Sequence, residues 1–236
     1  MNLSIVIPVY NEAEKIRNDI ITLSSYLMEK HISGEIIISD DASTDDTIKI
    51  ASETSINESI PLSVISTGEH RGKGNAVRQG ILQSKGDVVL FIDSGNTVKL
   101  DAISKGLDLI QGGECQMVIG SRHLSGSVIT KPLAFQRQIV SKLFRIFIKL
   151  IFPSLWRFSD TQCGFKMVKG ELAKTLYSES VINGFLFDIE ILKKAQKHNV
   201  AIQEIPIEWT CDRDSRLSFI PTIWEVIRDS WKLKFK

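Results

Sequence analysis

Short apolar runs alternate with longer segments of helical spacing in the N-terminal part of the chain. Four runs are rich in β-branched residues, which is typical of strands buried on both faces: Leu3–Val9, Ile36–Ile38, Leu62–Ile65 and Val88–Ile92. Between them, three segments predict helices: Glu14–Lys30, Thr44–Glu53 and Gly74–Gln83. This alternation predicts the α/β fold class, with a mostly parallel sheet covered by helices on both faces.

The regular alternation fades after Gly120. Val200–Trp209 is expected to form an edge strand, because Pro206 has no N–H to donate to a neighbouring strand. No segment rich in Gly, Ser or Pro divides the chain. We therefore expect one domain over residues 1–236, with an appended part that begins at about residue 125.

Polar residues follow three of the expected strands. Tyr10-Asn11-Glu12 comes after the first strand, Asp40-Asp41 after the second, and Asp93 after the fourth. Ligands of open parallel sheets bind outside the carboxyl ends of the strands. A single acid at such a position could equally be a helix N-cap, but three strand ends at one edge of the sheet favour a binding site.

Composition excludes some classes of function. The chain has 236 residues, of which 24% are charged, and its formal net charge is +1, so no nucleic-acid partner is expected. Cys115, Cys163 and Cys211 lie far apart and form no CxxC pair, which favours neither a zinc site nor a disulfide framework and indicates a reducing compartment. The first expected strand begins within three residues of the start, which leaves no room for a signal peptide.

Residues 160–166 read Asp-Thr-Gln-Cys-Gly-Phe-Lys, a mixture that no helix or strand periodicity explains. Four motifs precede it: Ile-Pro-Val-Tyr-Asn-Glu (7–12), Asp-Asp-Ala-Ser-Thr-Asp-Asp-Thr (40–47), Arg-Gly-Lys-Gly-Asn-Ala-Val-Arg (71–78) and Gly-Ser-Arg (120–122). In this order and spacing, residues from about 3 to about 216 resemble the inverting GT-A glycosyltransferases of family two. The similarity is greatest to the dolichyl-phosphate β-glucosyltransferase branch and its bacterial relatives. The resemblance implies a GT-A, Rossmann-like fold and transfer of a sugar from a nucleotide sugar.

The resemblance places the nucleotide of a UDP-sugar against the first two strand ends. Asp41 would accept hydrogen bonds from the uracil ring or the ribose. The alternative is that Asp40 and Asp41 only begin the helix at Thr44. Arg71 and Lys73 flank glycines that let the backbone approach a phosphate. The donor residues implied by the resemblance are Pro8, Tyr10, Glu12, Asp41, Arg71, Lys73, Asp93 and Ser94.

Family members hold a divalent cation with an Asp-x-Asp motif, where this chain reads Asp93-Ser94-Gly95-Asn96. Because Mg²⁺ and Mn²⁺ prefer carboxylate oxygens, Asp93 is the expected metal ligand. Gly95 cannot replace the second acid, so we expect a weakened Mg²⁺ or Mn²⁺ site. The alternative is that Asp93 is only the first residue of a turn.

The resemblance also implies a catalytic set and an acceptor site. Asp160 and Gln162 would lie near the reacting sugar or its metal, and with Asp93 and Arg122 they form the expected catalytic set. Four cations would bind an acceptor phosphate: Arg122, Arg137, Lys166 and Arg216. Asp188 and Glu190 match a further motif, but their spacing makes them diverge on a strand or a helix, so they are not expected to form an acid/base pair.

In this branch the acceptor is a lipid monophosphate, which is largely dianionic at pH 7 because its second pKa is about 6, and which needs no general base. The expected reaction transfers a sugar from a UDP-sugar to a polyprenyl (dolichyl or undecaprenyl) phosphate with inversion, and glucose is the favoured sugar. Two alternatives remain. Transfer to a sugar hydroxyl would need a base, with Asp160 or Asp188 as candidates, and a nucleotide-sugar-binding protein would show no turnover. The donor sugar, the polyprenyl chain and the oligomeric state stay open.

Residues 133–158 predict an amphipathic helix. Its apolar part, Ile139–Phe152, would be about 21 Å long, too short for a bilayer core of about 30 Å. Three cations form one stripe (Lys142, Arg145 and Lys149) beside an apolar face (Leu143, Ile146, Phe147 and Leu150). Ile220–Lys236 has a similar composition. An ordinary surface helix is the alternative, but we expect peripheral attachment to the cytoplasmic side of a membrane, without a spanning segment. Residues 1–124 would then bind the nucleotide sugar, and residues 125–236 the acceptor and the membrane.

Overall fold

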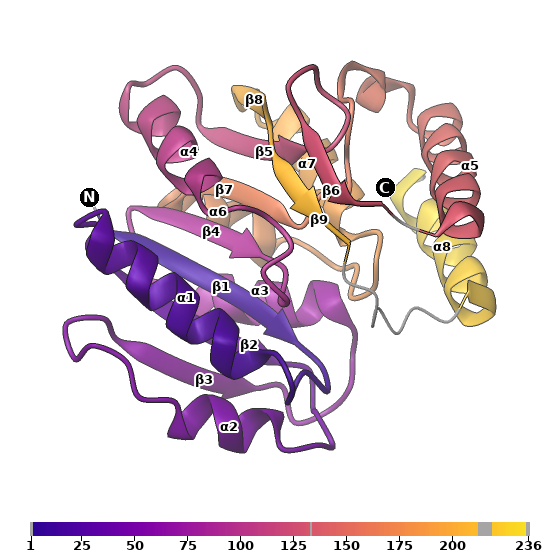
Figure 1. The fold of residues 1–236 in the computed structure, drawn as a ribbon. Coiled ribbons are helices and arrows are strands. Elements are labelled where there is room, and N and C mark those ends of the chain that lie inside the picture. Colours follow the sequence, from indigo (N-terminus) through magenta and orange to yellow (C-terminus); the bar gives the residue numbers. More distant parts are fainter. Residues whose placement is uncertain (1, 133, 212–218, 235–236) are drawn as a thin grey trace.

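The computed structural model describes residues 2–132, 134–211 and 219–234, and only the backbone of residues 219–223. Figure 1 shows a central sheet with helices packed against it. The strands are β1 (Leu3–Val9), β2 (Gly34–Asp40), β3 (Leu62–Ser66), β4 (Val88–Ile92), β5 (Met117–Ser121), β6 (Val128–Lys131), β7 (Phe165–Lys169), β8 (Ile202–Pro206) and β9 (Glu208–Thr210). The helices are α1 (Ile16–Glu29), α2 (Thr47–Glu53), α3 (Lys73–Gln83), α4 (Asp101–Gln111), α5 (Phe135–Ile151), α6 (Gly170–Ser178), α7 (Phe187–Lys197) and α8 (Phe219–Lys234), with a short 3₁₀ helix, η1 (Pro153–Arg157).

The main sheet has the strand order β3-β2-β1-β4-β7-β5-β8. All neighbouring strands are parallel except those beside β7, which runs antiparallel to both β4 and β5. Strand β8 pairs only with β5 within this sheet and ends at Pro206, as the missing N–H of proline requires of an edge strand. The structure therefore confirms the predicted α/β class and its mostly parallel sheet.

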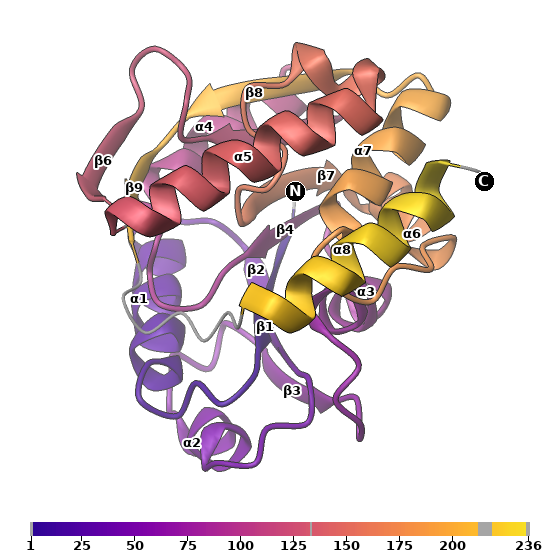
Figure 2. The ribbon, with the colours of Figure 1, turned by 90° about the vertical axis from the view of Figure 1, so that its right-hand side faces the viewer.

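Two layers of apolar side chains cover the sheet. Alternate residues of β1 point to opposite faces, so that Ile5 and Ile7 join a core with α1 and α4, whereas Val6 joins a core with α3, α6 and α7. The prediction of strands buried on both faces is confirmed by β1 and β4, in which every residue is buried. Both helical layers are visible when Figure 1 is compared with Figure 2.

Residues beyond 124 contribute both to the main sheet and to structure outside it. Strands β7 and β8 lie within the main sheet, while β6 and β9 form a separate pair. Helices α5 and α8 lie at one side of the molecule (Figure 1), which faces the viewer in Figure 2, and each buries residues in the core shared with α3, α6 and α7. Among the described residues, no helix combines the length and the hydropathy that crossing a bilayer requires.

Some boundaries differ from those expected. Helix α2 begins at Thr47 rather than at Thr44, because the Asp45 carboxylate accepts hydrogen bonds from the backbone N–H (3.0 Å) and the hydroxyl (2.5 Å) of Thr47. The expected strand over residues 200–209 divides into β8 and β9 at Ile207. Strands β5, β6 and β7 have no counterpart among the expected elements.

Candidate functional site

The carboxyl ends of β1 and β2 meet the loop that precedes α3, and Asp41 joins them. The buried carboxylate of Asp41 accepts hydrogen bonds from the backbone N–H groups of Arg71 (3.0 Å) and Gly72 (2.7 Å), and it lies 2.9 Å from Nδ1 of His70. The His70 ring stacks on Tyr10, with the ring centroids 4.1 Å apart. Asp41 thus fixes the position of the loop.

Neither acid of the 40–41 pair caps α2, whose N-cap residue is Asp46; it is the Asp45 carboxylate that accepts a hydrogen bond from the backbone N–H of Thr47. The Asp40 carboxylate is fully buried and accepts hydrogen bonds from the backbone N–H of Ser43 (3.0 Å) and the hydroxyl of Ser66 (3.2 Å). Both acids therefore organise loops at the sheet edge. This position is compatible with the donor role expected of Asp41, although protein groups already contact its two oxygens.

The remaining residues of the expected nucleotide pocket lie around this loop. Pro8 is buried within β1, opposite Ser39 of β2. Glu12 follows β1 and forms an ion pair with Lys15 at 3.2 Å. Tyr10 is 38% exposed. Of the three, Tyr10 presents the largest open surface, and its ring together with His70 forms a stacked aromatic platform beside Asp41.

The first turn of α3 is clamped against the loop between α6 and α7. Gly72 has a φ of +109°, and a Cβ there would lie 2.7 Å from the backbone oxygen of Asn183. A Cβ at Gly74 would lie 2.6 Å from the Cβ of Phe187. The backbone N–H of Asn75 also donates to the Asn183 oxygen (3.2 Å). The two glycines therefore serve close backbone packing that a side chain would prevent.

Lys73 and Asp93 form an ion pair at the centre of the site, with 2.6 Å between Nζ and Oδ1. A second pair lies beneath it, between Lys166 and Asp188, also at 2.6 Å. Both ammonium groups lie near the ring of Phe91. Burial opposes the charge on Lys73, but Asp93 and Asp188 outweigh this effect and raise the Lys73 pKa. Burial also raises the pKa of Asp188, against the opposing influence of Lys166 and Lys73.

The turn after Asp93 is held from the other side of the sheet. The buried carboxylate of Asp19 in α1 accepts hydrogen bonds from the hydroxyl of Ser94 (2.7 Å) and the backbone N–H of Gly95 (2.8 Å). Gly95 has a φ of +91°, which is the left-handed region that glycine adopts readily. Burial raises the pKa of Asp19 despite these hydrogen bonds. The hydroxyl of Ser94, which we expected in the donor site, is thus bonded within the protein.

The Asp93 site fits a divalent cation only in part. The carboxylate chemistry is suitable, and the absence of a side chain at Gly164 leaves room for that carboxylate, since a Cβ there would overlap it. However, the described residues include no cluster of three or more His, Cys, Asp or Glu side chains able to hold a metal ion. A cation at Asp93 would need oxygens from a bound substrate to complete its shell.

Arg122 and Asp160 form the second charged centre. The Arg122 guanidinium donates to both carboxylate oxygens of Asp160, through Nε at 2.6 Å and Nη2 at 2.9 Å, and the Arg122 backbone N–H adds a bond at 3.2 Å. Burial opposes ionisation of Asp160, but Arg122 outweighs it and lowers the Asp160 pKa to about 2. The same pairing raises the pKa of Arg122. The guanidinium also lies 5.3 Å from the ring of Trp209.

The loop that carries Asp160 is anchored by strand β8. The Glu204 carboxylate accepts hydrogen bonds from the Ser159 backbone N–H (3.0 Å), the Ser159 hydroxyl (2.8 Å) and the Asp160 backbone N–H (3.1 Å). Gln162 follows, half-buried, with its backbone N–H donating to Asp160 (3.3 Å). This network holds the 159–162 loop beside Arg122.

The four expected acceptor cations have different surroundings. Arg122 is neutralised by Asp160, as described above. Lys166 is only 1% exposed and donates to the Cys163 carbonyl (2.8 Å) as well as pairing with Asp188, so it does not open onto solvent. Arg137 is half-buried on α5. Arg216 lies outside the described residues. On α5, Arg145 contacts the ring of His123, which follows Arg122 in sequence.

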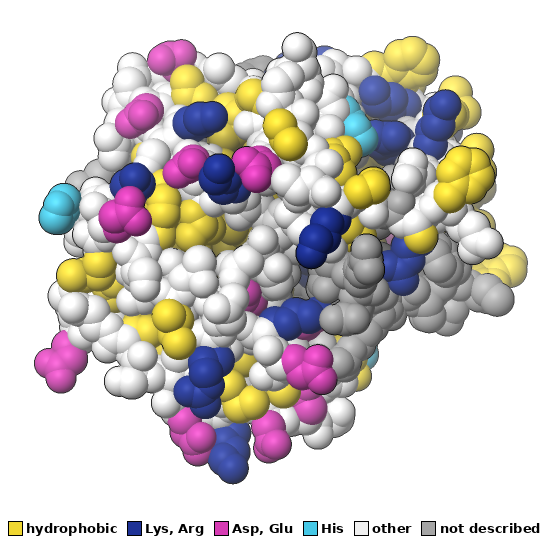
Figure 3. All heavy atoms as spheres, viewed as in Figure 1, with side chains coloured by type: hydrophobic (Ala, Val, Ile, Leu, Met, Phe, Trp, Pro, Cys, Tyr) yellow, Lys and Arg dark blue, Asp and Glu magenta, His cyan; other side chains and the backbone are white. Residues whose placement is uncertain are grey.

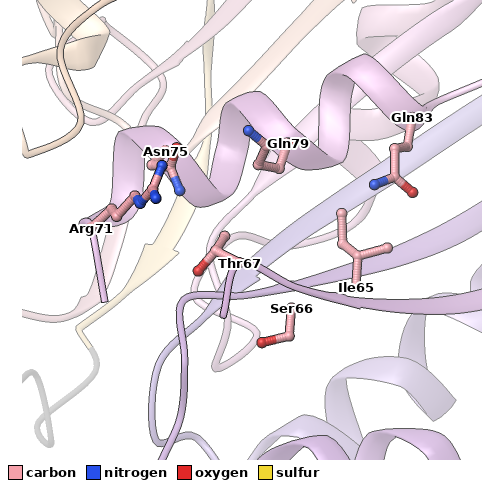
Figure 4. A pocket seen from close by; sticks show the side chains of 7 residues that line it. All are labelled: Ile65, Ser66, Thr67, Arg71, Asn75, Gln79 and Gln83. Carbon is pink, nitrogen blue, oxygen red and sulfur yellow. The ribbon is translucent and has the colours of Figure 1, made fainter. Parts of the chain in front are cut away.

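A polar pocket of about 190 Å³ lies along the outer side of α3 (Figure 4). Asn75, Gln79 and Gln83 line it from the helix, with Arg71 at one end. Ser66 and Thr67 line it from the end of β3. Arg71 is the one residue of the expected donor site in this lining, and neither ion-paired centre contributes to it.

Several residues of the site were not anticipated from the sequence. His70, Asp19 and Glu204 bind Asp41, the 94–95 turn and the 159–160 loop, respectively. Asn183 supports the start of α3. Each of these four residues contacts a partner at least 29 residues away in the sequence. Only His70 could have been suspected from its sequence neighbours, since it directly precedes the Arg-Gly-Lys-Gly motif.

Proteins of known activity resemble this chain over most of its length. A dolichyl-phosphate beta-glucosyltransferase of Dictyostelium discoideum is 32% identical over 246 residues, which cover 99% of this chain and 74% of that protein. The human protein of the same name is 32% identical over 91% of this chain and 69% of its own length. The structure of glucosyl-3-phosphoglycerate synthase from Mycobacterium tuberculosis with Mn²⁺ and UDP-glucose superposes with a TM-score of 0.72 at 20% identity, covering 99% of this chain and 78% of that one, which shows the shared fold.

The sequence profile described as Glycosyl transferase family 2 matches residues 4–175. This match covers most of the sheet. It includes the Lys73–Asp93 and Arg122–Asp160 pairs and also Lys166. It confirms the resemblance deduced from the motifs, and the chain therefore belongs to glycosyl transferase family 2 and is a glycosyltransferase.

Proposed function

We propose that this protein transfers glucose from UDP-glucose to the phosphate of a polyprenyl lipid, with inversion at the anomeric carbon. The names of its relatives support the glucosyl group and the acceptor, since several are dolichyl-phosphate beta-glucosyltransferases. The solved structures that share its fold include complexes with UDP-glucose and Mn²⁺.

The choice of acceptor rests on one observation: the two candidate bases, Asp160 and Asp188, are both held in ion pairs. Asp160 is bound on both oxygens by Arg122, and its pKa of about 2 keeps it ionised and weakly basic at neutral pH. Asp188 is 4% exposed and paired with Lys166. A sugar hydroxyl would need a free base to remove its proton. A phosphate monoester is already largely dianionic at pH 7 and needs none, so these paired acids favour the phosphate acceptor.

On the donor side, the Tyr10–His70 platform and Asp41 would receive the nucleoside. Lys73 and Arg71 would bind the diphosphate, with Lys73 supplying a point charge within a backbone that already approaches closely. Asp93 would hold Mg²⁺ or Mn²⁺ together with donor oxygens. When bound, the cation supplies positive charge to the departing diphosphate.

On the acceptor side, Arg122 and Arg137 would meet the lipid phosphate. Asp160 fixes the direction of the Arg122 guanidinium, and Gln162 lies on the same loop near the reacting sugar. Lys166 would act indirectly, by holding Asp188 and the Cys163 carbonyl beneath the site. Arg216 remains a candidate for closing over the diphosphate.

A lipid acceptor requires the protein to reach a membrane, and α5 is suited to this contact. Its exposed apolar side chains lie at positions 135, 139, 140, 143, 146 and 150, and Leu150 is 68% exposed. Figure 3 shows hydrophobic and basic side chains together at the edge formed by α5. Helix α8 adds Trp224 and Trp231, and it meets the end of α5 where Ile151, Trp231 and Lys234 line a common pocket. We therefore propose peripheral binding at the cytoplasmic face of a membrane through residues 125–236, with the donor bound by residues 1–124; the exposed apolar side chains of α5 and α8 support the membrane contact.

The transfer reaction can be tested directly. The protein is incubated with UDP-[¹⁴C]glucose, Mn²⁺ or Mg²⁺ and a short polyprenyl phosphate, and the butanol-extractable label is counted. UDP-galactose and UDP-N-acetylglucosamine serve as competing donors, and Asp93→Ala as the inactive control. Label in the butanol phase is expected. Label on water-soluble glycans would replace this proposal with hydroxyl transfer, and nucleotide binding without any product would leave a binding protein.

Membrane attachment is tested by sedimentation with liposomes. Leu143→Glu and Leu150→Glu change two exposed residues of α5, and Leu82→Glu changes a residue of α3 that is 39% exposed and serves as the matched control. The α5 variants are expected to lose binding to anionic vesicles, while the control keeps it. High salt should weaken binding of the parent, and equal sedimentation with neutral and anionic vesicles would contradict the electrostatic part of the proposal.

A further inference from the structure

Lys73 occupies the place beside Asp93 where a divalent cation would bind. Its ammonium lies 2.6 Å from Oδ1 of Asp93, and both side chains are only partly exposed, at 29% and 32%. The other oxygen of Asp93 faces Gly164, where a side chain would overlap it. Asp93 is therefore already provided with a counter-ion by the protein.

The backbone that carries Lys73 is fixed, and only the side chain can move freely. Gly72 and Gly74 both pack against the 182–187 segment so closely that a Cβ would clash. Arg78 strengthens the contact by donating to the backbone oxygen of Ser180 (3.0 Å) and to Oδ1 of Asn183 (2.9 Å). Any departure of the ammonium from Asp93 must therefore occur by rotation of the lysine side chain.

The charges around this pair are balanced. Two cations, Lys73 and Lys166, face two anions, Asp93 and Asp188. A free divalent cation at Asp93 would displace the Lys73 ammonium and leave it unpaired near the added charge. Because residue 95 is a glycine, no second acid in this turn would compensate. A nucleoside diphosphate changes this balance, because its oxygens can accept the ammonium and also bind the metal.

We propose that the Lys73 ammonium passes from Asp93 to the diphosphate of the donor, so that a divalent cation binds this protein tightly only together with the nucleotide. The inference rests on the proposed nucleotide-sugar donor and goes further by assigning Lys73 as the group that couples the two ligands. Such coupling is reciprocal, because the factor by which UDP raises the affinity for Mn²⁺ equals the factor by which Mn²⁺ raises the affinity for UDP.

The test measures binding without acceptor or turnover. Mn²⁺ binding is followed by electron paramagnetic resonance and UDP binding by calorimetry, each with and without the other ligand. In the parent, UDP is expected to raise the Mn²⁺ affinity at least tenfold, and UDP is still expected to bind in excess chelator through Lys73. In Lys73→Met, Asp93 loses its counter-ion. The free protein should then bind Mn²⁺ more tightly than the parent, while UDP binding in chelator falls at least tenfold.

Two further variants keep the test decisive. Lys174→Met removes a half-buried lysine of α6, remote from the site in sequence, that pairs with Glu171 at 3.7 Å, and it should behave as the parent. Asp93→Asn should free Lys73, so UDP binding in chelator is kept or strengthened while the effect of Mn²⁺ disappears. The inference is overturned if the free parent binds Mn²⁺ as tightly as its UDP complex does, or if Lys73→Met and Lys174→Met behave alike. Either result would leave the proposed transfer intact, whereas failure of UDP to bind under every condition would overturn both.

Discussion

Replacing Asp160 by asparagine tests the central claim about the Arg122–Asp160 pair. The change keeps the shape of the side chain and removes the charge. Asp160 is 2% exposed, and its carboxylate accepts three hydrogen bonds from Arg122. In the variant, the amide would present one donor group to a guanidinium that can only donate. Asp160→Asn therefore leaves a largely buried Arg122 without an anionic partner.

Two considerations give the expected loss of unfolding free energy in Asp160→Asn. Removing one member of a buried ion pair costs about 3–5 kcal/mol, because the other charge stays buried. The fall of the Asp160 pKa from 3.8 to about 2 is worth about 2.5 kcal/mol at neutral pH. Because the folded-state pKa is depressed, this stabilisation is present above about pH 4 and is lost as the pH falls toward 2. We expect Asp160→Asn to lower the free energy of unfolding by about 3 kcal/mol at pH 7.

The assay is urea unfolding of parent and variant at pH 7, repeated at intervals down to about pH 2.5. Glu208→Gln is the matched control, because Glu208 pairs with Lys99 at 3.3 Å on the exposed surface and should contribute less than about 1 kcal/mol. The difference between the parent and Asp160→Asn should shrink below about pH 4. The claim that Arg122 and Asp160 form a stabilising buried ion pair would be refuted by either of two results. One is a loss of unfolding free energy under about 1 kcal/mol at pH 7, and the other is a difference between parent and variant that does not change with pH.

Three other substitutions test the donor side. Gly164→Ala should reduce turnover at least tenfold with a smaller effect on the melting temperature, because its Cβ displaces the Asp93 carboxylate; equal activity and an unchanged metal requirement would contradict this. Gly95→Asp, which would restore the second acid, should instead cost about 1–2 kcal/mol of unfolding free energy, because residue 95 has a φ of +91°; a lower Mn²⁺ requirement without loss of stability would show that the turn tolerates the acid. Asp41→Ala should lower both UDP affinity and stability, the latter by about 1–2 kcal/mol, because two backbone N–H groups of the 71–72 loop lose their acceptor; calorimetry and thermal melting measure the two effects, and an unchanged melting temperature would show that Asp41 serves the ligand alone.

Most of the fold could be predicted because local patterns carry it. The apolar β-branched runs at 3–9 and 88–92 marked strands that are buried on both faces. Strand β7 was less visible, because Lys166 interrupts an otherwise apolar segment and finds its partner Asp188 only in α7. A buried charge breaks the periodicity on which sequence interpretation relies, and its compensation lies in another element.

The candidate site likewise has a part that the sequence predicts and a part that it does not. Its acids could be located, because they follow strand ends and lie in unusual motifs. Their partners could not, because Arg122 and Asp160 are 38 residues apart and Asp41 and Arg71 are 30 apart. These distances reflect how the strands are ordered in the sheet, which no single motif encodes. The positive φ of Gly95 was equally hidden in the sequence, and it disfavours an aspartate side chain at that position.

The pairing of the site acids has a consequence for ligand choice. Asp93 and Asp160 each have a cation of the protein against them, and Asp41 is held by backbone donors and His70. A ligand can engage such groups only by exchanging partners, since an unpaired charge is unfavourable and the more so the less it is exposed. An anion that bound alone would pair with Lys73 and leave Asp93 without a cation. A metal ion that bound alone would pair with Asp93 and leave Lys73 without an anion. A diphosphate that arrives with a divalent cation satisfies both groups at once, so the internal pairs themselves favour a metal-bound nucleotide over either component.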